Sequence, residues 1–105
     1  MNQQIPELWN IHRTSKFPRG YGGVNIDGIE LVLLDGDVAG CILTFIENDG
    51  QLDIWRTAIL GICYRNLTVV TSQLSGEAKE FFSRLETLSR LVLKDIIAIE
   101  KVHHQ

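Results

Sequence analysis

The apolar residues in the second half of the chain recur at spacings of three and four, which is the period of an amphipathic helix. Between residues 52 and 74 this stripe continues for about six turns, and Asp53 stands at its start, where a negative charge suits the helix dipole. Between residues 76 and 101 the stripe is equally regular, with Ser75 in the position of an N-cap. The pattern predicts two long helices, over residues 52–74 and 76–101.

Residues 28–48 allow two interpretations. As strands, they would form a hairpin over residues 29–46, with Asp35-Gly36 as its type I′ turn. The flanks of this turn, however, contain a continuous apolar run instead of the alternation typical of half-buried strands. As a helix, the stretch has apolar residues at spacings of three and four, and Asp27 and Glu30 have the spacing of a capping box. We therefore expect a helix over residues 28–48, and an α+β fold with the hairpin is the alternative.

The first part of the chain has a different character. Residues 1–26 contain both prolines, three of the nine glycines and few apolar residues, so we expect an irregular basic arm with at most a short helical turn near Trp9. Short linkers between long helices make neighbouring helices antiparallel. The prediction is one all-α domain, in which residues 27–105 form three antiparallel helices behind the arm.

Composition narrows the class of protein. The chain has 105 residues, of which 45% are apolar, enough for one globular core. No apolar run approaches the roughly 20 residues that span a bilayer, and the N-terminus lacks a basic segment followed by an apolar one. We expect a cytoplasmic protein that does not enter a membrane. The net charge of −3 makes nucleic acid an unlikely partner.

Charges are sorted along the chain. Residues 21–55 contain seven acidic residues and no lysine or arginine. The arm just before this block carries three cations among aromatic residues: Arg13, Lys16 and Arg19, with Phe17 and Tyr21. The arm therefore has two interpretations. It packs on its own acidic block or on another subunit, or it binds a partner, in which case the cations could contact phosphates and an aromatic ring could stack on a base.

The expected turn near Gly50 sets a register between the first two long helices. Residues whose numbers sum to about 101 lie level with each other, so Gly40 would face Gly61 and let the two backbones approach closely. The same register, extended to the third helix, predicts one polar level in the bundle, formed by Asp35, Asp37, Tyr64, Arg65 and Arg84. This level would be either an ion-pair network or a small site for an anion or a carboxylate.

Candidate chemistry is sparse. Cys41 and Cys63 lie in apolar stretches without a histidine nearby in sequence, which is typical of buried structural thiols. No spacing of histidine, cysteine or carboxylate residues indicates a metal site, and His103-His104 belongs to a tail that we expect to fray. We expect no enzyme, no catalytic residues, no cofactor and no metal.

The surplus of apolar residues indicates a partner. The last predicted helix carries more of them than one stripe needs, and Trp9 and Trp55 add to the surplus. We therefore expect a small non-enzymatic protein–protein interaction or regulatory module, working as a homodimer. The residues expected to bind the partner are Arg13, Lys16, Phe17, Arg19, Tyr21, Leu91, Leu93 and Ile97. The alternatives are a small anion- or carboxylate-binding protein and an acidic inhibitor or immunity-type protein that binds a basic partner.

Overall fold

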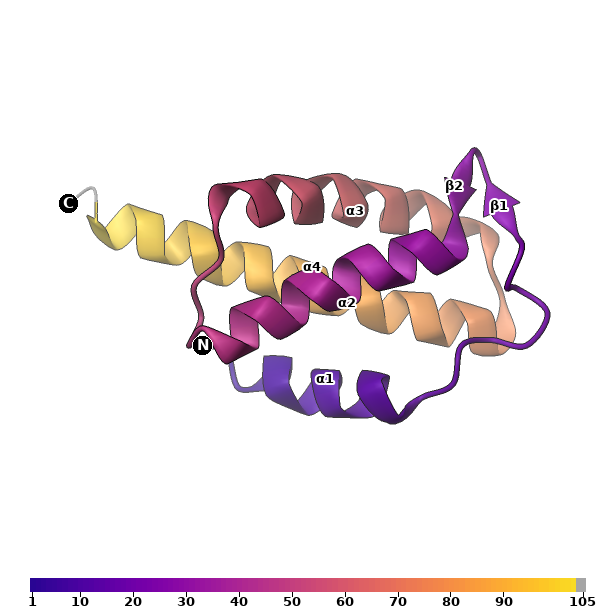
Figure 1. Ribbon diagram of the computed structural model, residues 1–105, viewed down its shortest axis with the longest axis horizontal. Helices are drawn as coiled ribbons and strands as arrows, with labels where there is room; N and C mark the ends of the chain where they lie inside the picture. Colours follow the sequence, from indigo (N-terminus) through magenta and orange to yellow (C-terminus); the bar gives the residue numbers. More distant parts are fainter. Residues whose placement is uncertain (104–105) are drawn as a thin grey trace.

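The computed structural model describes the backbone of residues 1–103 and the side chains up to Ile99. This part of the chain forms four α-helices that run up, down, up and down (Figure 1). They are α1 (Gln4–Thr14), α2 (Leu31–Glu47), α3 (Ile54–Gln73) and α4 (Gly76–His103). Two short strands, β1 (Asn25–Ile26) and β2 (Ile29–Glu30), pair antiparallel just before α2. The all-α class predicted from the sequence is confirmed, and the long hairpin over residues 29–46 is not formed.

The helices are arranged around α4, which packs against all three others. Helix α2 packs against α4 and α3, and less extensively against α1. Figure 1 shows α3 and α1 on opposite sides of the α2 and α4 pair. The largest fully buried side chains are Phe45, Phe82, Ile5, Leu31, Ile42, Leu60, Leu67, Leu85 and Leu88. No helix in the described part of the chain is long and apolar enough to cross a membrane.

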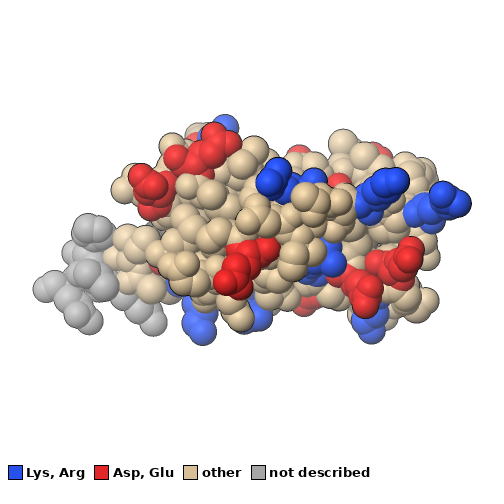
Figure 2. Space-filling view, turned by 90° about the horizontal axis from the view of Figure 1, so that it is seen from below, with Lys and Arg blue, Asp and Glu red and all other residues tan. Residues whose placement is uncertain are grey.

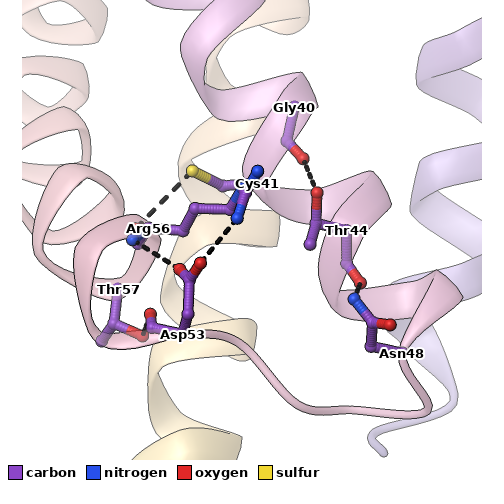
Figure 3. Close-up of polar contacts among 7 residues, drawn as sticks. All are labelled: Gly40, Cys41, Thr44, Asn48, Asp53, Arg56 and Thr57. Carbon is purple, nitrogen blue, oxygen red and sulfur yellow. Dashed lines mark hydrogen bonds and ion pairs between the residues drawn. The ribbon is translucent and has the colours of Figure 1, made fainter.

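The turn between α2 and α3 follows the prediction closely (Figure 3). Asp53 is the N-cap of α3, and its Oδ1 accepts a hydrogen bond from the backbone N of Arg56 at 2.8 Å. The Arg56 guanidinium returns to Asp53 Oδ2 at 2.6 Å. Across the seam between the helices, the Cys41 thiol donates to the carbonyl oxygen of Arg56 at 3.6 Å. The Asp53 cap thus fixes where α3 begins, and the Cys41 bond holds that first turn beside the middle of α2.

The start of α2 differs from the expected capping box. Asp27 and Gly28 are the central residues of a tight hairpin, with φ of 51° and 80°. Two central residues with positive φ are the signature of a type I′ turn, and Asp-Gly is a preferred pair for it. Glu30 precedes the helix in extended conformation and makes no side-chain cap, while Leu31 N donates to the carbonyl oxygen of Val24 at 3.2 Å. The hairpin thus takes the place of the predicted cap.

The main correction concerns residues 1–26, because residues 4–14 form helix α1. The side chains of Ile5, Leu8, Trp9 and His12 lie three, four and seven positions apart and make its inner face, which packs on α4 and α2. Pro6 falls in the first turn, where its missing N–H costs no hydrogen bond. At the N-terminus, the backbone N of Asn2 donates to Asp95 Oδ2 on α4 at 2.8 Å. Only residues 15–24 remain as an irregular arm, and α1 belongs to the packed bundle.

The prediction that Gly40 and Gly61 allow a close backbone approach is wrong. A Cβ atom on either residue would meet no other heavy atom within 4 Å, and Gly40 is exposed. Larger side chains, among them Cys41 and Cys63, fill the seam between α2 and α3 instead. These glycines weaken the two helices without any packing gain within the monomer.

Candidate functional site

The arm is fastened to its own bundle by apolar side chains. The Phe17 ring meets Phe81 and Phe82 of α4 edge to face, with centroids 5.5 and 6.0 Å apart. Pro18 is buried, and Tyr21 is half-buried against the core. The arm therefore packs intramolecularly, but on α4 and not on the acidic block that the sequence suggested. In this arrangement the half-buried Phe17 ring is part of the bundle.

A pocket of about 690 Å³ lies between the arm and α4. We call it the arm pocket, and its lining residues are Ser15, Lys16, Phe17, Pro18, Arg19, Glu77, Glu80, Phe81 and Arg84. Phe81 and Pro18 provide apolar surface and are themselves almost fully buried. The half-buried Arg84 reaches from α4 to the arm, where its Nη1 donates to Ser15 Oγ at 3.2 Å.

The charges around the arm pocket are not paired with each other. Lys16 and Arg19 on the arm and Glu77 and Glu80 on α4 are all exposed, and none lies within 4.0 Å of an opposite charge among the side chains described. Figure 2 shows basic side chains gathered at the end of the molecule that carries the arm, with acidic side chains beside them. The cations of the arm thus do not neutralise the acidic block. Arg13, which the sequence placed in the arm, belongs to α1 and donates to Asn10 Oδ1 of the same helix.

A partly buried pair beside Phe81 ties α1 to α2. His12 Nε2 and Asp35 Oδ1 are 2.9 Å apart, and the His12 side chain is only 7% exposed. The His12 ring also packs on Trp9 and Phe81, with centroids 5.8 and 4.8 Å away. When Nε2 donates to the carboxylate, Nδ1 of the neutral ring is a bare acceptor, and Nδ1 is buried without a hydrogen-bond partner. Sequence reasoning missed this pair, although the place of His12 in the α1 stripe could have revealed it.

The predicted polar level is not formed. Asp35 turns to His12 on α1, Arg84 turns to Ser15 on the arm, and no salt bridge among the described side chains joins the aspartates to Arg65 or Arg84. Tyr64 is half-buried on α3, and Asp37 and Arg65 are exposed. Residues two apart on a helix point to different sides, so Asp35 and Asp37 cannot serve one site.

The two cysteines are free and buried. Burial is the main cause that raises the pKa of the Cys63 thiol to about 11, and the nearby Asp37 carboxylate and Cys41 add to it. Burial also raises the pKa of Cys41, although the Arg56 cation opposes the shift. Both thiols therefore keep their protons at neutral pH, which does not suit a nucleophile. In the described part of the chain, no group of three or more histidine, cysteine or acidic side chains is placed to hold a metal ion.

The apolar residues expected to bind a partner divide into two groups. Leu91 is buried, and Leu93 is half-buried against the core, so the prediction of a partner surface is wrong for Leu91. Ile97 is 53% exposed near the end of α4, as expected. Trp9 packs on the core, whereas Trp55 on α3 is 78% exposed. Among the side chains described, the strongest exposed apolar surface therefore lies on α3 and not on α4.

A second candidate site is an exposed apolar face along the seam of α2 and α3. On α3, Trp55, Ile59, Ile62 and Val69 follow one another at spacings of four, three and seven, and all are exposed. The next residue on this stripe, Gln73, bonds to Asp27 beside the start of α2 at 2.7 Å, so the stripe flanks the seam. On α2, Leu33, Asp37 and Gly40 share a stripe, and Asp37 lies close enough to Cys63 to raise its pKa. We call this surface the seam face: Leu33 and Gly40 of α2 with Trp55, Ile59, Ile62 and Val69 of α3.

Comparison of the chain with protein-family models, with curated proteins and with solved structures found no match. A function is therefore inferred from three structural features: the bundle, the arm pocket and the seam face.

Proposed function

We propose that this protein is a protein–protein interaction module that forms a homodimer through the seam face. The observation that carries the proposal is the double-sided character of α3. One side buries Leu60, Cys63 and Leu67 in the core, and the opposite side exposes Trp55 and Ile62. A helix that is apolar on both sides is typically covered on both sides. In the monomer, α2 and α4 cover only the inner one.

A second copy of the chain fits this surface because the α3 stripe is self-complementary. In a two-fold arrangement with antiparallel α3 helices crossing at Ile62, that residue meets its own copy. Residues whose numbers sum to 124 then face each other, so the large Trp55 meets the smaller Val69 of the second copy. The stripe between Trp55 and Gln73 carries one charged residue, the exposed Arg65, which lies three positions after Ile62 and four before Val69 and is level with Ile59 of the second copy. Such a helix pair removes the apolar surface of α3 from water and leaves the exposed Arg65 at its edge, where a long side chain can keep its guanidinium in solvent.

The size of the surface also suits a dimer. A helix of 20 residues is about 30 Å long, and α2 beside it widens the surface to about 20 Å. The resulting footprint of roughly 600 Å² approaches the roughly 800 Å² per partner of standard interfaces. Gly40 gives a reason to include α2, because its open surface lets a partner helix approach closely. No contact within the monomer requires a glycine at this position, and glycine makes α2 less stable than alanine would.

The test measures the mass of the protein in solution by sedimentation velocity and by light scattering after gel filtration, over a wide concentration range. We expect a dimer for the wild type. Ile62→Glu places two like charges at the two-fold axis, because each copy contributes one, so it should yield a monomer. The matched control is Ile11→Glu on α1, whose side chain has a similar exposure of 48% against 55% for Ile62. This variant should stay dimeric.

A second variant separates association from folding. Gly40→Ala adds a methyl group that meets nothing in the monomer, so it should stabilise the isolated fold by up to about 1 kcal/mol. The same methyl group stands in the way of a closely packed partner and should weaken the dimer. A wild-type protein that is monomeric at every concentration overturns the proposal. Equal effects of Ile62→Glu and Ile11→Glu overturn it as well, because the seam face would then have no special role.

A further inference from the structure

The arm pocket has a basic wall on the arm and a mainly acidic wall on α4, and apolar packing holds the two walls apart. The arm wall carries Lys16 and Arg19, and the α4 wall carries Glu77 and Glu80, with Arg84 about one turn further along the helix. The position of the arm is set by Phe17, which is wedged against the α4 phenylalanines, and not by attraction between the walls. The walls therefore stay separate, and their charged groups face the pocket without partners among the described side chains.

We propose that the arm pocket binds a small zwitterion whose anionic and cationic groups are several ångströms apart. Arg84 has five N–H donors in a planar fork, and the one described contact is the single bond to Ser15. The remaining donors suit a carboxylate, with Lys16 and Arg19 adding positive charge. The ammonium group of the ligand meets Glu77 and Glu80, which lie about two turns and one turn before Arg84 on α4. ω-Amino acids and diamino acids such as lysine belong to this class.

The pocket also sets the size of the ligand and the character of its middle. Its volume of about 690 Å³ lies within the range of roughly 300–1,000 Å³ that is common for small-molecule sites. Phe81 and Pro18 offer apolar contact for a carbon chain that joins the two charged groups. A ligand with a single charge would leave either the acidic or the basic side chains of the pocket without a partner. A neutral ligand would leave both sets without one. The pocket lies between the arm and α4, whereas the seam face belongs to α2 and α3, so this inference does not depend on dimer formation.

The test titrates the full chain with three probes of matched carbon skeleton at constant ionic strength: 6-aminohexanoate, hexanoate and hexylamine. Binding is followed by calorimetry and by amide chemical shifts. We expect saturable shifts in residues 15–19 and 77–84 with 6-aminohexanoate, and an affinity at least ten-fold lower for either probe with a single charge. Shorter glycine should also bind at least ten-fold more weakly, because its two charges are too close together to reach both walls.

Variants assign each charge to its wall. Arg84→Gln should lower the affinity for 6-aminohexanoate to that for hexylamine, and the Glu77→Gln, Glu80→Gln double variant should lower it to that for hexanoate. Arg90→Gln, an exposed arginine of α4 outside the pocket, is the control that should bind like the wild type. Because Arg84 also holds Ser15, the Lys16→Gln, Arg19→Gln double variant removes two other cations of the pocket, both exposed, without touching that contact.

Three results would overturn the proposal. Equal affinity for hexanoate and 6-aminohexanoate would show that the acidic wall takes no part. Equal losses of affinity for 6-aminohexanoate in Arg84→Gln and Arg90→Gln would show that only the net charge of the protein matters. The absence of saturable shifts in residues 15–19 and 77–84 with 6-aminohexanoate would show that the pocket is not a site for such a molecule.

Discussion

The partly buried contact between His12 and Asp35 predicts a measurable coupling between α1 and α2. Replacing Asp35 with Leu leaves the 7% exposed His12 ring without a partner at Nε2, beside an Nδ1 atom that already has none. An unsatisfied buried polar group costs about 1–3 kcal/mol. Leucine is also a better helix former than aspartate by up to about 0.7 kcal/mol, which offsets part of that loss. A single variant would therefore understate the contact.

A double-mutant cycle removes this difficulty. His12→Phe keeps a ring against Trp9 and Phe81, but it leaves the Asp35 carboxylate without its donor. The double variant His12→Phe, Asp35→Leu has neither polar group, so it should be less destabilised than the sum of the single variants. We expect a coupling free energy of about 1–3 kcal/mol, measured by urea denaturation at neutral pH with circular dichroism as the readout.

The surface pair Asp53 and Arg56 is the matched control. Both side chains are about half exposed, so their coupling should be only about 0.2–1 kcal/mol. If the His12 and Asp35 changes add within about 0.5 kcal/mol, the partly buried contact contributes nothing beyond packing. Our explanation of how α1 is held to α2 would then be wrong.

Three further predictions concern stability. Phe82→Ala, at a fully buried position, should lower the free energy of unfolding by about 3–5 kcal/mol in urea denaturation, and a loss below about 1 kcal/mol would contradict the packing. The pKa of Cys63 is raised from 9.0 to about 11, so between these pH values the folded state holds a proton that the unfolded state has lost. The free energy of unfolding should therefore fall by roughly 1–3 kcal/mol as the pH rises through this window; Cys63→Ala should lack this part of the slope, and identical pH profiles for variant and wild type would refute it. Asp53→Ala should lower the thermal midpoint through the loss of about 1 kcal/mol of capping, while Asp53→Asn should keep most of it; an unchanged midpoint for the alanine variant would count against the cap.

The long helices could be predicted because each carries a regular apolar stripe over many turns. The expected start of the first of these helices was three residues early, at residue 28 instead of Leu31, because the sequence pattern of a capping box also fits a tight turn at Asp27-Gly28. Helix α1 escaped prediction for a different reason. It has only 11 residues, no side-chain N-cap, and a histidine as one of its inner residues. A helix this short depends on tertiary packing, which sequence periodicity does not report.

The polar contacts were harder to predict than the helices. An error of one residue in the register between two helices turns a side chain by about 100° around its helix. A register that places two residues at about the same height therefore does not show that their side chains meet. Asp35 bonds to His12 of a helix that was not predicted, and Arg84 bonds to an arm whose position depends on Phe17. The N-cap Asp53 could be predicted because its partner is three residues away in the same chain segment.

The arrangement around α4 has a consequence for how the chain folds during synthesis. Helix α1 is made first, yet it packs mainly on α4, the last of the four helices to be made. While residues 1–75 emerge from the ribosome, the hairpin of α2 and α3 can form, but Phe45 and Leu67 lack the α4 side chains that complete the core. The cooperative fold therefore forms only after the chain has been extended well into α4, and a nascent chain stalled before that point would expose apolar surface to chaperones and proteases.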